Sequence, residues 1–94
     1  MSFIVAIHDV SDPGRFWGAA SEGLAQLPPS VSLLTTYPQA DGARAVCLWE
    51  APSVDAVREI VDTGTGDFSR NEFFEVDPQH PGTRGLPAQA ATGR

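Results

Sequence analysis

Few side chains in this sequence are suited to acid–base, nucleophilic or metal chemistry near neutral pH: two histidines and one cysteine. His8 and Cys47 fall in apolar segments of strand character, whereas His80 lies in a segment rich in proline and glycine. An imidazole titrates near neutrality, so His8 is the candidate general base and the candidate catalytic residue. A histidine beside a cysteine could also activate the thiol as a nucleophile or bind a transition metal. Structural packing is the alternative role for Cys47.

Two aromatic residues, Trp49 and Tyr37, are candidates for the walls of a binding cavity. Their rings supply large apolar surfaces with one polar group each, which suits an aromatic or polyketide-like ligand. Dimer packing is the alternative. Glu72 and Glu75 point to opposite faces of the last predicted strand, so only one of them can approach His8. The candidate ligand-binding set is therefore His8, Tyr37, Cys47, Trp49 and Glu75.

Acidic side chains outnumber basic ones: twelve carboxylates face six arginines, lysine is missing, and the net charge is −6. Nucleic-acid and anionic-membrane surfaces need clustered basic side chains, so neither partner is predicted. A single cysteine cannot form an internal disulfide, which is typical of a protein of the reducing cytoplasm. The sequence has no Cys-x-x-Cys, Gly-x-Ser-x-Gly or His-Glu-x-x-His motif, so it predicts no metal clamp or hydrolase of those kinds.

The elements that must position these residues follow from hydrophobic periodicity. Strands are predicted over residues 3–8, 31–37, 43–50 and 71–76, with helices beginning at Pro13 and just after Ser53. Asp12 and Ser53 are the expected N-caps, and Asp41-Gly42 predicts a tight turn within a hairpin. The order β-α-β-β-α-β predicts an α+β, ferredoxin-like sandwich, in which a four-stranded antiparallel sheet carries both helices on one face. This domain covers residues 1–77, and residues 78–94 are predicted to form a flexible Pro/Gly/Ala-rich tail.

Alternation along the two central strands separates two sets of side chains. The more aliphatic set is expected under the helices: Phe3, Val5, Ile7, Val46 and Leu48. The other set is expected on the uncovered face of the sheet: Ile4, Ala6, His8, Ala45, Cys47 and Trp49. An apolar face of this size is rarely left in water. It predicts a homodimer, a dimeric α/β barrel with a cavity at the sheet face.

Residues 43–60 read Ala-Arg-Ala-Val-Cys-Leu-Trp-Glu-Ala-Pro-Ser-Val-Asp-Ala-Val-Arg-Glu-Ile. This segment resembles the small bacterial dimeric α/β-barrel proteins of the nickel-responsive, largely uncharacterised class. The resemblance implies a ferredoxin-like homodimer and a role for cysteine and histidine in binding nickel or another transition metal. Cys47 matches the cysteine position, and His8 is the histidine nearest to it in the predicted sheet. The class usually has further histidines in and after the second helix, where this chain has Val61 to Thr65.

Three functions remain open at this point. The first is a homodimeric binding protein that holds a small apolar or aromatic molecule, or a metal ion, in a cavity on the sheet. The second is a cofactor-independent enzyme of the isomerase, cyclase or monooxygenase type, with His8 as general base. The third is a structural dimerisation module. The lack of a catalytic constellation favours the binding protein.

Overall fold

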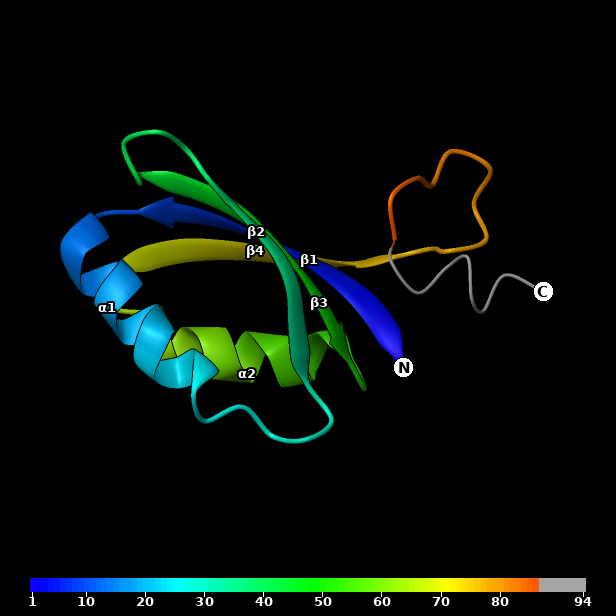
Figure 1. Cartoon of the computed structure of the whole chain (residues 1–94), viewed down its shortest axis with the longest axis horizontal. Helices are drawn as coiled ribbons and strands as arrows, with labels where there is room; N and C mark the ends of the chain where they lie inside the picture. The colour runs from blue at the N-terminus through cyan, green and yellow to red at the C-terminus, as the bar shows by residue number, and fades with distance from the viewer. Residues whose placement is uncertain (87–94) are drawn as a thin grey trace.

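The computed structural model describes residues 1–86 and confirms the predicted α+β fold. The elements are β1 (Ser2–Val10), α1 (Pro13–Leu24), β2 (Ser32–Pro38), β3 (Arg44–Ala51), α2 (Val54–Thr65) and β4 (Ser69–Val76). All strand pairs are antiparallel, and the sheet order is β2-β3-β1-β4. Both helices lie on the same side of the sheet (Figure 1), which is the ferredoxin-like arrangement.

Each helix begins at the residue that the sequence predicts. Asp12 accepts a hydrogen bond from the Arg15 backbone N–H through its side chain, and Pro13 occupies the first turn, where no N–H is needed. The Ser53 hydroxyl likewise accepts from the backbone N–H of Ala56 at 3.1 Å. These caps fix where the chain leaves β1 and β3 and enters the helix layer.

The side chains under the helices are those that the sequence analysis assigned to the uncovered face, so that assignment was wrong. The main core cluster consists of Ile4, Ala6, Val31, Cys47, Trp49, Ala51, Val57 and Val61. His8 and Ala45 are paired across β1 and β3 on this same face and are buried as well. The physical reason that the helices cover this face is the size of the Trp49 side chain. Trp49 is the largest side chain of the two central strands, and the helices supply the cover that leaves it 5% exposed.

The opposite face of the sheet, called here the open face, carries the aliphatic set. By strand pairing it comprises Phe3, Val5, Ile7, Tyr37, Val46, Leu48, Phe74 and Val76 in its apolar part. No helix of the described chain covers it, and Phe74 is 50% exposed. The sheet therefore has an apolar face without helix cover, but this face lacks His8, Cys47 and Trp49.

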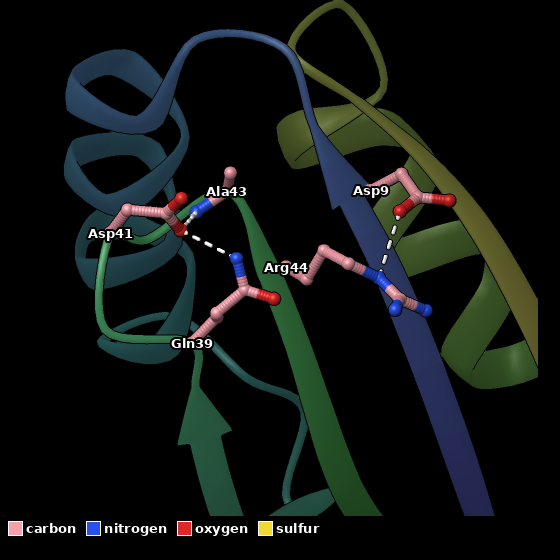
Figure 2. A network of polar contacts seen from close by, with 5 residues as sticks. All are labelled: Asp9, Gln39, Asp41, Ala43 and Arg44. Carbon is pink, nitrogen blue, oxygen red and sulfur yellow. Dashed lines mark hydrogen bonds and ion pairs between the residues drawn. The ribbon is translucent and has the colours of Figure 1, made fainter.

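The hairpin between β2 and β3 is held by side-chain contacts at its tip (Figure 2). The Asp41 carboxylate accepts hydrogen bonds from the Ala43 backbone N–H and from the Gln39 side-chain amide, both at 2.9 Å. These two donors hold the pKa of Asp41 below its usual value. On the neighbouring strand pair, Arg44 Nε donates to Asp9 Oδ1 at 3.1 Å and joins β3 to β1.

Gly42 occupies the one position of this turn that requires glycine. Its φ is +75°, and a Cβ added there would lie 3.1 Å from Trp17 Nε1. Gly42→Ala is therefore expected to lower the free energy of unfolding by about 1–3 kcal/mol, measured by urea denaturation. Gly18 is the matched control. It is an exposed helical glycine with nothing within 4 Å of an added Cβ. Gly18→Ala should raise stability by about 0.5–1 kcal/mol, and equal effects at both sites would contradict the strained turn.

Beyond β4, the chain turns over residues 78–82, and Asp77 holds this segment by hydrogen bonds. Its carboxylate accepts from the Gln79 backbone N–H, and its carbonyl oxygen accepts from the Thr83 hydroxyl. Leu86 is buried. The predicted flexible tail also includes residues 87–94, which lie outside the described residues. Across residues 1–86, no helix is long and apolar enough to cross a membrane.

Candidate functional site

A cavity of about 250 Å³ lies between α1 and the helix-facing side of the sheet and is partly open to solvent. It exists because the two helices pack differently. α2 packs closely on β1, β3 and β4, whereas the close packing of α1 is with α2. The inner side of α1 is also built from small residues, Ala19, Ala20 and Gly23, which leave the space unfilled. Larger apolar side chains complete the walls, among them Phe16, Trp17, Leu27, Leu33, Trp49 and Ile60.

His8 contributes the one imidazole of this mostly apolar wall, which also includes Ser21, Thr36 and Thr65. The side chain is 2% exposed, and the Phe16 ring lies against it with 5.4 Å between ring centroids. Its Nδ1 is 2.7 Å from Oδ1 of Asn71, the residue paired with it on β4. The predicted partner on β4 was a glutamate. Strand pairing instead places Glu72 opposite Ile7 on the open face, and Asn71 next to the imidazole.

Hydrogen bonds on the far side of Asn71 fix which of its atoms faces His8. Asn71 Nδ2 donates to Asp62 Oδ1 at 3.1 Å, and an ionised carboxylate can only accept, so the amide nitrogen must point to α2. The amide oxygen then points to His8, where it also lies 2.9 Å from the Ser69 hydroxyl. His8 Nδ1 must therefore carry the hydrogen. In the neutral imidazole, Nε2 is left as the unprotonated acceptor.

Burial keeps that imidazole neutral. Removal from water lowers the pKa of His8 below the usual histidine value, and the hydrogen bond to Asn71 opposes this only in part. At pH 7 His8 is thus a hydrogen-bond acceptor and a base, and it presents no positive charge to the cavity.

Cys47 lines the same cavity from β3, where it is paired with Ala6 of β1. The sequence analysis expected this residue at a cavity on the uncovered face instead. Its thiol donates to Thr36 Oγ1 at 3.7 Å, and burial raises the pKa of Cys47. A protonated thiol is a weak nucleophile and a weak metal ligand. Residues 1–86 also contain no group of three or more His, Cys, Asp and Glu side chains that could hold a metal ion. His8 and Cys47 alone do not fit a resident nickel ion.

Trp49 forms part of the cavity wall and is buried among the core residues. Its indole N–H is buried and has no hydrogen-bond partner among residues 1–86. An unpaired buried donor costs about 1–3 kcal/mol. The wall therefore contains one donor that the rest of the described chain does not satisfy.

The other two candidate ligand-binding residues lie away from this cavity. Tyr37 is 67% exposed and is paired with Val46, which places it on the open face. Glu75 is paired with Ile4 and so belongs to the helix side, but it is exposed on the outer strand β4 and does not line the cavity. The structure thus brings together His8, Cys47 and Trp49, and adds Asn71 behind His8.

No protein-family model matches this sequence, and no curated protein matches it significantly. The geometry of the cavity is therefore the basis for a functional proposal.

Proposed function

We propose that this protein binds a small, uncharged, largely apolar molecule in the cavity between α1 and the sheet. The observation that carries the proposal is the cavity itself, which combines about 250 Å³ of space with mostly apolar walls, a few hydroxyl groups and a single neutral imidazole. Its lining contains no Asp, Glu, Lys or Arg, so an ionic ligand would lose its hydration without gaining a counter-charge.

The volume indicates the size of the ligand. A cavity of about 150 Å³ in another protein holds one benzene molecule. By that measure, about 250 Å³ has room for two fused aromatic rings. Trp49, Phe16 and Trp17 provide aromatic walls suited to such rings.

An enzyme that uses His8 as general base is the second candidate, and the orientation imposed by Asn71 supports it. Nδ1 is held by Asn71, and Nε2 keeps its lone pair. However, the cavity lining supplies no carboxylate or second imidazole to return the proton. This shortage is the reason that binding is proposed ahead of catalysis.

We also propose that two copies of the chain associate through their open faces. The apolar part of that face is exposed at Val46, Phe74 and Tyr37, and such surfaces are commonly buried between identical subunits. Charged side chains border this apolar part: Arg44, Arg70, Asp9 and Glu72 lie at one end of the face, and Glu50 lies beside Phe3 at the other.

The buried free thiol of Cys47 supports a reducing, cytoplasmic setting for this dimer.

Filling the cavity tests the binding proposal. Ala20 lines the cavity from α1 and is only partly exposed, so Ala20→Leu should place its added carbons in the space for the ligand. Binding of naphthalene, followed by chemical-shift changes in heteronuclear NMR spectra, is expected to weaken at least about tenfold. Ala25→Leu makes the same change at an exposed position just after α1 and should leave binding unchanged. Absence of saturable naphthalene binding to the unmodified protein would refute the proposal.

A further inference from the structure

We propose that the molecule bound in this cavity is a small hydroxyl-bearing aromatic, a phenol or naphthol, whose hydroxyl donates a hydrogen bond to Nε2 of His8. This inference rests on the proposed binding function and specifies the class of ligand. It assigns His8 as the polar contact of the site and Asn71 as the positioning residue that presents Nε2 to the ligand.

The hydrogen bonds behind His8 have a defined direction. Asp62 accepts from Asn71, and Asn71 accepts from Nδ1 of His8, so the network runs from the surface of α2 to the cavity wall. The Ser69 hydroxyl lies 2.9 Å from the same Asn71 oxygen and 3.1 Å from the Thr65 carbonyl oxygen, so the orientation of the amide depends on the contact with Asp62. The network leaves the imidazole one function at the cavity, which is acceptance of a hydrogen bond at Nε2.

That acceptor lacks a partner within the described chain. Nε2 makes no hydrogen bond to any of residues 1–86, although the imidazole is almost fully buried and forms part of the cavity wall. Among residues 1–86, Trp49 Nε1 is the one fully buried side-chain nitrogen or oxygen without a partner, so Nε2 of His8 keeps access to the cavity, where a ligand hydroxyl can donate to it. An ammonium donor is disfavoured, because no carboxylate lines the cavity to pair with its charge.

The aromatic side chains around the imidazole favour a planar ring as the ligand. The Phe16 ring is tilted at 55° to the imidazole, with centroids 5.4 Å apart, so an aromatic ring borders the imidazole. A planar ring that carries a hydroxyl can lie against Phe16 and Trp49 while its O–H points to Nε2. An aliphatic alcohol would satisfy Nε2 but would fill the space between aromatic walls less completely.

The test compares 2-naphthol with naphthalene, which has the same rings and no hydroxyl. The unmodified protein should bind 2-naphthol about tenfold more tightly than naphthalene, a ratio that corresponds to about 1.4 kcal/mol. His8→Leu should remove this preference and retain the binding of naphthalene. His80→Leu, at an exposed histidine of the turns after β4, should retain both. Equal affinities in the unmodified protein would overturn the hydroxyl contact and leave the binding proposal standing. Binding of neither compound would overturn both.

A spectroscopic measurement keeps the test valid if His8→Leu does not fold. In the unmodified protein, the ¹⁵N shift of His8 Nε2 should be that of an unprotonated nitrogen, and 2-naphthol, but not naphthalene, should change it. Asn71→Leu should shift the tautomer toward protonated Nε2 and reduce the preference for 2-naphthol while naphthalene still binds. A protonated Nε2 in the unmodified protein at pH 7.5 would refute the assignment.

The pH dependence provides a further check. Phe16 from α1, Ala45 from β3 and Asn71 from β4 carry no charge where they adjoin His8, and Asp62 from α2 reaches it only through Asn71. Protonation of His8 converts Nε2 from acceptor to donor. The preference for 2-naphthol should therefore be full above the pKa of His8 and disappear as the pH falls through it. A preference that persists in acid, with the protein still folded, would contradict the contact.

Discussion

Ile4→Ala is expected to lower the free energy of unfolding by about 2–5 kcal/mol. Ile4 is fully buried in the main core cluster between the sheet and α2, so truncation removes buried carbon and leaves a void that the close packing of α2 cannot collapse. Urea denaturation followed by circular dichroism measures the change.

The matched control is Ile7→Ala on the same strand. Ile7 has the same side chain but points to the open face, where it is only partly buried in the protomer. Its truncation should cost less than half as much as that of Ile4. Denaturation at several protein concentrations separates any contribution from association, because a dimer gains stability with concentration and a monomer does not. A larger loss at Ile7 would show that the core lies on the other face of the sheet.

These two variants test which face of the sheet the helices cover, and on this point the prediction from the sequence was wrong. Period-two alternation correctly placed His8, Cys47 and Trp49 on one face of the central strands. It could not decide which face the helices cover, since both sets are apolar and both would pack against a helix. The decision depends on volume: the small residues Ala6 and Ala45 leave room for Trp49 and the helix side chains to be buried together.

Tyr37 shows a second limit of alternation. Strict alternation along the predicted strand 31–37 places Leu33 and Tyr37 on the same side. In the structure the pairing of β2 with β3 shifts between Leu33 and Thr35. Leu33 is paired with Trp49 and lines the cavity, whereas Tyr37 is paired with Val46 and faces the other way. One extra residue reverses the face to which all later side chains of the strand point. The sequence of this segment contains no local signal that predicts the bulge.

Asn71 was missed for a related reason. The order of elements predicts that β4 lies next to β1, but only the register brings Asn71 opposite His8. The elements, the caps and the hairpin turn could be predicted because they depend on local chemistry: Asp12 and Ser53 satisfy free N–H groups, and Gly42 adopts a positive φ. The site could not be predicted from the sequence, because the cavity depends on how incompletely the side chains of α1 fill the space above the sheet.

Val46→Arg is expected to weaken the proposed dimer by about 100-fold or more in dissociation constant. Val46 lies between Ile7 and Tyr37 on the open face and is 42% exposed in the protomer, so an arginine there does not disturb the core. In a two-fold dimer the change occurs twice, and each new charge would be buried without a partner. Sedimentation equilibrium measures the association, with Ala25→Arg as a control at an exposed position outside the sheet. An unmodified protein that sediments as a single chain at micromolar concentration would contradict the dimer.

The same variant separates association from binding. All side chains that line the cavity belong to one protomer and lie on the helix side of the sheet, away from Val46. A monomeric Val46→Arg protein should therefore bind naphthalene with unchanged affinity. If binding were lost together with the dimer, the ligand would have to occupy the seam between two open faces, and His8, Cys47 and Trp49 could not contact it, because they lie beneath the helices.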